Sequence, residues 1–229
     1  MATCTVGEMR VLLDSIANVV PYVNFILKDG LASFSAFDTH LTVLCTAALP
    51  VAYEASGCAY MHVPSCRAAL RSISMNTPLT ITIDDDNFTF KWANQTHTFT
   101  HIRLRPSPPL ASLFPAGCFS MPSCDLLKFV RDTNAATIDF KCADNYLHIV
   151  ATTDACKSQY FASPANDHFG SPITERNTSI TCTTRNVVSI AKASLFSKSV
   201  FISVCLNEVL FVYRSGAVAH ASFVLARAL

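Results

Sequence analysis

The feature that most constrains the fold of this chain is an amphipathic helix followed by a β-hairpin. Residues 119–154 hold the clearest copy of this unit. Ser123 is expected to cap the helix, because its hydroxyl can accept a hydrogen bond from a free backbone N–H at the helix start. Leu126 and Val130 then lie on an apolar side, and Lys128 lies on the other side. The unit predicts a short helix that packs on a sheet and exposes its cations.

The two strands of this unit are predicted from the alternation of apolar and polar residues. Ile138 and Phe140 alternate with polar neighbours, and Tyr146 and Val150 resume the pattern after an Asp-Asn turn. A period of two residues places alternate side chains on one face of a sheet. The helix is therefore expected to lead into an antiparallel hairpin.

The same order of elements occurs earlier in the chain, within residues 6–38. An amphipathic segment is followed there by a strand, an Asp-Gly turn and another strand. When the two turns are superposed, Phe25 falls on Phe140 and Phe34 falls on Ile149. A repeated unit predicts a repeated architecture, so we expect two copies of one α+β domain.

Two further helices, one in each half, complete the predicted units. The first is expected from a cap at Ser65 to about Ser74, and the second from about Thr184 to Leu195. The helix at the start of the chain is expected to end at Pro21, which cannot continue it. The remaining strands are expected within residues 22–54, 58–63, 79–104, 157–162, 177–183, 199–205, 208–214 and 217–225.

Residues 105–118 separate the two halves. Four prolines and a glycine in this stretch exclude a helix or a central strand. We therefore expect one domain at 1–104 and a second at 119–229, joined by this linker. Its hydrophobic side chains either pack on their own domain or form one wall of a peptide-binding groove.

Composition limits the class of protein. The 229 residues suit two domains of roughly 100 residues each, and 51% apolar with 14% charged residues argues against disorder. No membrane span and no signal peptide are visible, so an intracellular protein is expected. The ten cysteines are then expected to be reduced and buried, and their spacing predicts no metal site. No cofactor is expected either.

The distribution of cations is more informative than the net charge of +1. Each of the four predicted helices carries at least one Lys or Arg. Such cations either cover an ordinary solvated face or form a common surface for phosphates. They are Arg10, Arg67, Arg71, Lys128, Arg131, Arg185 and Lys192.

The order of these elements resembles that of the DNA sliding clamps, the PCNA (proliferating cell nuclear antigen) family. The resemblance rests on KDGLASFSAFDTHLTVL at 28–44, MPSCDLLKFVRD at 121–132, the helix with Arg185 and Lys192, and LARAL at 225–229. It implies two similar domains, each with curved antiparallel sheets and two helices on one face. It also implies three chains joined head to tail in a ring around double-stranded DNA, with no catalytic activity.

The resemblance implies roles for two sets of residues. The seven helix cations would face DNA phosphates without reading sequence. A groove would bind peptide motifs of DNA polymerase and other replication and repair proteins. Its residues would be Phe37, His40, Val43, Leu110, Leu113, Phe114, Pro115, Val224, Ala226 and Arg227.

The sequence also departs from the family pattern. Arg227 stands where the family has proline, Val224 stands where it has an aromatic residue, and the first helix carries only Arg10. The ring is expected to close by main-chain pairing between 98–104 of one copy and 157–163 of the next. A divergent copy of this kind suggests a viral protein, which would act in the host nucleus, as cellular clamps act in the nucleus.

Three alternatives remain open at this point. A checkpoint-clamp subunit that assembles with different chains has the same fold, and so does a herpesvirus-like processivity factor that does not close a ring. A cysteine hydrolase would belong to another class. The sequence shows no G-x-S-x-G, no recognised cysteine motif and no P-loop, which argues against an enzyme.

Overall fold

The computed structural model describes residues 1–38, 42–53, 57–84, 86–100, 118–143, 146–164, 177–205, 207–215 and 219–228. The first half contains β1 (Ala2–Thr5), α1 (Val6–Ile16), β2 (Tyr22–Lys28), β3 (Leu31–Phe37), β4 (Val43–Pro50), β5 (Ala52–Tyr53), β6 (Gly57–His62), α2 (Val63–Leu70), β7 (Pro78–Ile83), β8 (Asn87–Trp92) and β9 (Gln95–Thr100). The second half contains β10 (Cys118–Pro122), α3 (Ser123–Asp132), β11 (Thr137–Ala143), β12 (Tyr146–Thr152), β13 (Lys157–Pro164), β14 (Thr178–Thr183), α4 (Thr184–Ala191), the 3-10 helix η1 (Lys192–Leu195), β15 (Ser199–Val204), β16 (Glu208–Ser215) and β17 (Ala219–Ala226).

The two halves repeat one order of elements. With β5 set aside, β1 to β9 with α1 and α2 correspond one by one to β10 to β17 with α3 and α4. Strand pairing repeats as well, because Phe25 pairs with Phe34 in the β2–β3 hairpin and Phe140 pairs with Ile149 in the β11–β12 hairpin. The repeat predicted from the two superposed turns is therefore confirmed.

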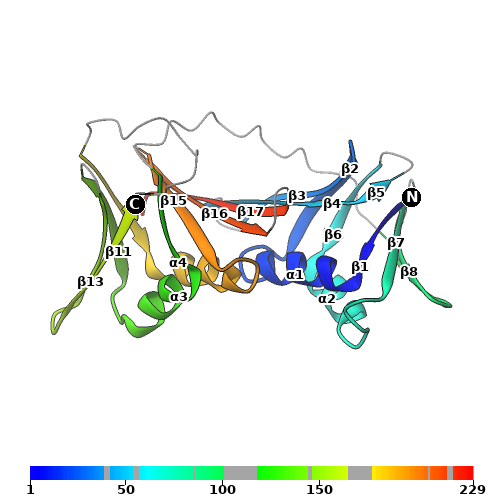
Figure 1. Ribbon diagram of the computed structural model, residues 1–229, viewed down its shortest axis with the longest axis horizontal. Helices are drawn as coiled ribbons and strands as arrows, with labels where there is room; N and C mark the ends of the chain where they lie inside the picture. The colour runs from blue at the N-terminus through cyan, green and yellow to red at the C-terminus, as the bar shows by residue number, and fades with distance from the viewer. Residues whose placement is uncertain are drawn as a thin grey trace.

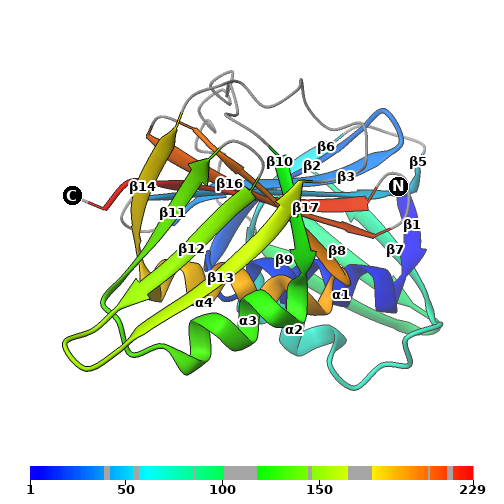
Figure 2. The ribbon, with the colours of Figure 1, turned by 60° about the vertical axis from the view of Figure 1, so that its left-hand side comes forward.

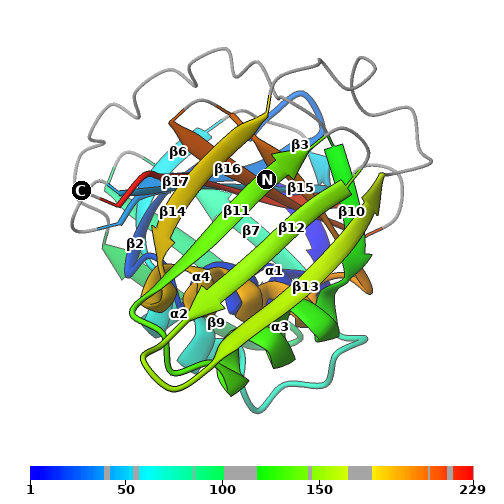
Figure 3. The same ribbon diagram turned by 90° about the vertical axis from the view of Figure 1, so that its left-hand side faces the viewer.

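Helices and strands occupy separate sides of the molecule. The helices lie together along one side, and the strands cover the opposite side and both ends (Figure 1). One sheet has the order β14-β11-β12-β13-β10-β15-β16-β17-β4-β3-β2-β6, and the other has the order β5-β1-β7-β8-β9. Figure 2 and Figure 3 show β14, β11, β12 and β13 side by side at one end, above α3 and α4.

A strand from each half joins the halves into one body. β17 pairs antiparallel with β4, from Leu225 opposite Val43 to His220 opposite Ala48. Val43 and Leu225 are buried together with Phe223 on the side that faces the helices. Main-chain pairing and a shared core therefore both cross the boundary between the halves.

The first helix begins with a capping box. The Glu8 N–H donates to the Thr5 hydroxyl (3.2 Å), and the Thr5 N–H donates to the Glu8 carboxylate (2.8 Å). These two bonds satisfy backbone groups that the helix itself leaves free. The predicted apolar side of α1 is fully buried and consists of Met9, Leu12, Leu13 and Ile16.

The predicted cap at Ser123 is wrong by one residue. Pro122 holds the N-cap position, and Ser123 is the first residue of α3. The Ser123 hydroxyl donates to the Ser197 carbonyl oxygen, and its N–H donates to the Lys198 carbonyl oxygen (2.9 Å). Strand β10 leads straight into the helix, so the segment before β15 satisfies these groups in place of a side-chain cap.

The second and first helices are shorter than predicted. α2 begins at Val63 and ends at Leu70, whereas the prediction ran from a cap at Ser65 to Ser74. The Ser65 hydroxyl is instead hydrogen bonded to the His62 ring (2.7 Å). α1 ends at Ile16, and turn residues lie between the helix and Pro21. The predicted helix 184–195 is found as α4 continued by η1.

Two strands were not predicted, and the linker lies outside the described residues. β1 and β10 are four and five residues long, and each runs directly into a helix. They form strands because β7 and β15 pair with them from far along the chain.

Residues 101–117 are outside the described part of the chain, so the boundaries 1–104, 105–118 and 119–229 stay predictions.

The cysteines are less uniformly buried than predicted. Among the cysteines whose burial the structure describes, Cys58, Cys124 and Cys156 are exposed, whereas five others, including Cys66 and Cys182, are buried. Burial raises the pKa of the Cys66 thiol to about 12, and burial together with the nearby Asp139 carboxylate does the same for Cys182. No thiolate therefore forms at these buried positions near neutral pH.

This difference predicts selective alkylation. At pH 8 iodoacetamide should modify Cys58, Cys124 and Cys156 in the folded protein and leave Cys66 and Cys182 unmodified, because only a reachable thiolate reacts. Peptide mass spectrometry after a short pulse measures the outcome. In urea the three exposed and the two buried cysteines named here should react at the same rate. Labelling of Cys66 as fast as Cys124 in the folded chain would contradict this burial pattern.

Candidate functional site

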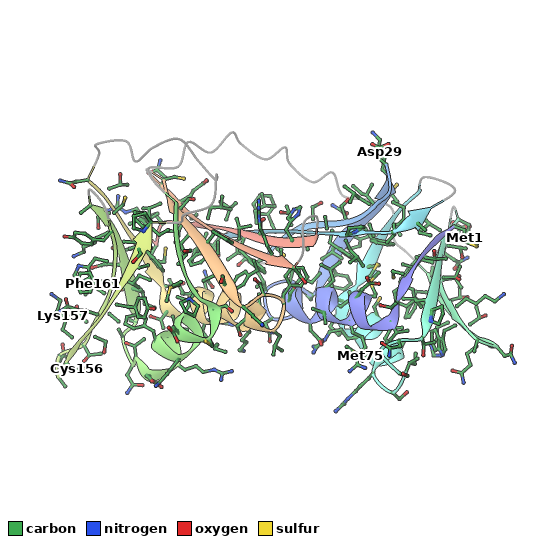
Figure 4. All side chains as sticks on the ribbon, in the orientation of Figure 1. Met1, Asp29, Met75, Cys156, Lys157 and Phe161 are labelled. Atoms are coloured by element: carbon green, nitrogen blue, oxygen red, sulfur yellow. The ribbon has the colours of Figure 1, made fainter. Side chains whose placement is uncertain are left out.

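The helix side of the molecule gathers side chains from both halves. α1 packs beside α2, α3 packs beside α4, and α1 also meets η1 across the boundary between the halves. The apolar sides of the helices pack against the strands, so their polar sides point away from the sheets (Figure 4). The predicted cations thus all belong to helical elements on one side of the molecule, except that Arg71 directly follows α2.

In the first half, α1 and α2 bring three arginines to one hollow. A depression of about 480 Å³ is lined by Arg10, Arg67 and Arg71, together with Asp14 and smaller residues of α2. The Arg67 Nε atom donates to an Asp14 carboxylate oxygen at 2.6 Å. The structure therefore brings together the three predicted cations of this half, and it adds an acidic residue that the sequence prediction did not include.

The three arginines differ in what holds them. Arg10 is half-buried and donates from Nη1 to the Ile73 carbonyl oxygen (3.3 Å), which fixes the chain after α2 against α1. Arg67 is engaged by Asp14. Arg71 is exposed, and no hydrogen bond or ion pair of its side chain is found within the described residues. Arg71 is thus the cation of this hollow most open to a ligand.

In the second half, the cations are spread along the helix side. Lys128, Arg131 and Arg185 are exposed, and Lys192 is half-buried at the start of η1. No ion pair holds these four side chains within the described part of the chain. They are available to anions from solution.

A small polar hollow marks the boundary between the halves. It measures about 130 Å³, and its lining includes Asp38, Arg185 and Asn186. Asp38 is 9% exposed and accepts from the Thr42 N–H (2.6 Å) and the Val43 N–H (2.8 Å), which ties β3 to β4. Asn186 donates from Nδ2 to the Thr42 hydroxyl (3.1 Å). The start of β4 is therefore fixed to α4 of the other half.

The outer face of the sheet carries an apolar row that crosses the same boundary. Phe37 pairs with Leu44, Leu44 pairs with Val224, and Val224 pairs with Leu210. Residues directly opposite in antiparallel strands share a face, so these four side chains lie side by side. Leu44 and Leu210 were missed from the sequence, although alternation along each strand, once the strands are paired, identifies both.

The predicted groove residues have different placements. Phe37 and Val224 belong to the apolar row, whereas Val43 is 2% exposed and packs in the core, because alternation turns it to the helix side. Ala226 is half-buried and Arg227 is exposed. The other predicted groove residues lie outside the described part of the chain: His40, Leu110, Leu113, Phe114 and Pro115.

The end of the chain is fixed by main-chain bonds. The Ala226 N–H donates to the Thr42 carbonyl oxygen (2.9 Å), and the Ala228 N–H donates to the Thr181 carbonyl oxygen (2.8 Å). The side chain of Arg227 remains exposed between these anchors. The tail therefore borders the apolar row at the end of β17.

The described residues contain no group of three or more His, Cys, Asp or Glu that could hold a metal ion. Within the same residues, no helix is both long and apolar enough to cross a membrane.

No protein-family model matches this sequence, and no curated protein matches it. Solved structures do match. Proliferating cellular nuclear antigen (PCNA) from Entamoeba histolytica has a TM-score of 0.82 at 14% identity, over 100% of this chain and 98% of that chain. The chain has the fold of the PCNA sliding clamps. A chain of the PCNA2–PCNA3 complex from Sulfolobus tokodaii has a TM-score of 0.81 at 15% identity, over 99% of both chains.

The clamp fold accounts for the architecture as a whole. Both matches cover nearly the full chain, so the prediction of two similar domains with antiparallel sheets and helices on one face is confirmed. At 14% and 15% identity the likeness extends to the fold and not to individual side chains. The chemistry of the helix side and of the apolar row therefore depends on the residues of this chain.

Proposed function

We propose that the protein is a DNA sliding clamp, a processivity factor that encircles duplex DNA and tethers a DNA polymerase to it. The observation that carries the proposal is the separation of elements: helices with exposed cations form one side, and strands form the opposite side and both ends (Figure 1). The match to PCNA over the full chain supports the same role. The role is mechanical, and it requires neither a catalytic residue nor a cofactor.

The helix cations supply the proposed hold on DNA. Contacts between Lys or Arg and phosphates depend on charge and carry no sequence information. A protein held in this way binds random duplexes and can slide along them. The proposed contact residues are Arg10, Arg71, Lys128, Arg131, Arg185 and Lys192, whereas the seventh predicted cation, Arg67, is engaged by Asp14.

Salt dependence tests the proposed DNA contacts. Each phosphate contact on duplex DNA adds about −0.9 to the slope of log K against log salt. Lys128→Ala and Arg185→Ala should each make the slope shallower by about that amount and should weaken binding to all sequences alike. Fluorescence anisotropy with random duplexes across a salt series measures both effects.

Lys28→Ala provides the matched control, because Lys28 is an exposed cation in the β2–β3 hairpin, away from the helices. It should leave the slope unchanged. Equal slopes for the parent, Lys128→Ala and Arg185→Ala would show that these side chains do not face DNA. A marked sequence preference in the parent would count against a clamp.

We propose that copies of the chain join as the two halves join. By the internal repeat, β9 corresponds to β17 and β13 corresponds to β4. β9 is the last strand of its sheet, and β13 pairs over Lys157–Ala162 only with β12 among the described strands. Pairing of β9 in one copy with β13 in the next would continue the sheet from chain to chain. Three copies would close a homotrimeric ring.

The pairing within the chain supplies a register for the pairing between copies. Transferred to the corresponding strands, it sets Thr96 opposite Gln159 and Thr98 opposite Lys157 of the next copy. Thr96 and Thr98 are exposed, whereas Phe99 packs against the core. Gln159 and Lys157 are also exposed, so outward positions meet outward positions. A slip by one residue would break that agreement.

A proline substitution tests this joint. Ala226, which corresponds to Thr100, donates its N–H across the internal pairing to Thr42. Thr98, two residues earlier, should likewise direct its N–H to the next copy. Thr98→Pro removes that donor at an edge strand, where proline is tolerated, and should leave monomers. The parent and Thr98→Ala should both show a mass near three times 24.9 kDa in solution.

Light scattering after size exclusion provides this measurement. A trimer of Thr98→Pro would contradict the proposed joint. A parent that is monomeric at every concentration but still binds DNA would favour a processivity factor that does not close a ring.

We propose that partner proteins dock on the outer apolar row. An extended peptide with bulky apolar anchors would lie across Phe37, Leu44, Val224 and Leu210, beside Arg227 of the tail. The predicted linker residues would form the opposite wall. DNA polymerase and other replication and repair proteins are the partners proposed, with the nucleus, or the host nucleus for a viral chain, as the setting.

A pair of substitutions on β16 tests the docking surface. Leu210→Asp places a charge within the apolar row and should abolish stimulation of the partner polymerase on primed template, with DNA binding unchanged. Val212→Asp lies on the same strand and face, but opposite Ser222, one row away. It should retain stimulation. Equal loss in both variants, or full stimulation by Leu210→Asp, would contradict docking at this row.

A further inference from the structure

We propose that Asp14 competes with DNA phosphate for Arg67 in the hollow between α1 and α2, so that the first domain holds duplex DNA less tightly than its three arginines would allow. The inference rests on the proposed function, because it assigns a role within the DNA-facing side. The ligand is the phosphodiester backbone of the duplex. The Asp14 carboxylate would weaken the binding of that backbone by Arg67.

The geometry of the hollow supports a competition. Arg10, Arg67 and Arg71 line one depression of about 480 Å³, and Asp14 lines it with them. The Arg67 Nε atom and the Asp14 Oδ1 atom are 2.6 Å apart. Carboxylate and phosphate oxygens use the same donors of a guanidinium group. A phosphate that enters the hollow therefore meets an Arg67 whose Nε donor is already engaged by the Asp14 carboxylate.

The exposure of this ion pair keeps it exchangeable. The side chains of Arg67 and Asp14 are 45% and 34% exposed. Exposed ion pairs contribute little to folding stability, so the pair is not needed to hold α1 against α2. Its main consequence concerns ligands, because a carboxylate in the hollow both occupies one cation and repels phosphate.

The second domain provides a comparison without the acid. The helix starts correspond, because the Val6 N–H bonds to the segment before β7 as the Ser123 N–H bonds to the segment before β15. When α1 and α3 are aligned from Val6 and Ser123, Arg131 of the second domain falls at the position of Asp14 in the first domain.

The other lining positions follow from the same alignment. When α2 and α4 are aligned from their first residues, Lys192 corresponds to Arg71, and Arg185 corresponds to Pro64. The positions of the second domain that correspond to the lining of the hollow thus hold Arg131, Arg185 and Lys192, and none of them holds a carboxylate. The two domains are therefore expected to grip DNA unequally.

The test is a double-mutant cycle read from salt slopes. Asp14→Asn removes the negative charge that competes with phosphate for Arg67, so one further phosphate contact should form and the slope of log K against log salt should steepen by about 0.9. Arg67→Ala in the parent should leave the slope nearly unchanged, because Arg67 makes no phosphate contact there. Arg67→Ala in the Asp14→Asn background should remove the gained 0.9. The probe is a random-sequence duplex, and the protein is the full chain in its native assembly.

Asp29→Asn is the matched control. Asp29 is likewise an exposed acid beside a cation, with Lys28 Nζ at 3.9 Å, but it lies on the side of the molecule opposite Met75 and the helices (Figure 4). Asn is also well suited to its backbone, since φ of Asp29 is 51°. The net charge changes by the same amount as in Asp14→Asn. The slope should stay that of the parent.

Each outcome separates this inference from the proposed function. An unchanged slope in Asp14→Asn, with normal binding by the parent, overturns the role of Asp14 and leaves the clamp proposal standing. A slope shallower by about 0.9 for Arg67→Ala in the parent also overturns it, because Arg67 would then already contact phosphate. This second measurement decides the matter even if Asp14→Asn does not fold. Absence of DNA binding by the parent overturns both proposals.

Discussion

Antiparallel pairing of β17 with β4 is the interaction on which the rest of this structure depends. It joins the last strand of the chain to a strand of the first half. The helices of both halves come to one side because each half is a copy of the same unit and this pairing sets the copies in line. Asp38, Thr42 and Asn186 strengthen the joint with side-chain hydrogen bonds. A surface of cations contributed by four helices is a consequence of that joint.

The sequence predicted the repeated unit because its signals are local. The strand pair that contains Phe25 and the one that contains Phe140 each alternate around a two-residue turn, and this pattern can be read without knowledge of the partner strands. β1 and β10 escaped prediction because four or five residues carry too little periodicity. Only pairing with β7 and β15, far along the chain, makes them strands.

The candidate site was predicted in part for the same reason. Helical spacing identifies the cations of each helix, since neighbours on one helix face lie three or four residues apart. Asp14 could not be assigned to them, because its contact with Arg67 joins two helices far apart in the sequence. Leu44 was missed, and Val43 was chosen, because the direction in which a strand residue points depends on register. Contacts between distant elements are what the sequence does not encode locally.

The composition of β9 has a consequence for how an assembly of this chain would open. Where β17 places Ala221 and Phe223 toward the core, the corresponding positions of β9 hold Gln95 and His97. Less apolar area would then be lost from water at a joint between chains than at the joint within one chain. The weak links would lie between chains, so a ring could part there while every chain stays folded. If the joint between chains opens more readily, backbone amides of β9 should exchange faster than those of β17 in the assembled protein. Equal protection of the two strands would exclude the difference.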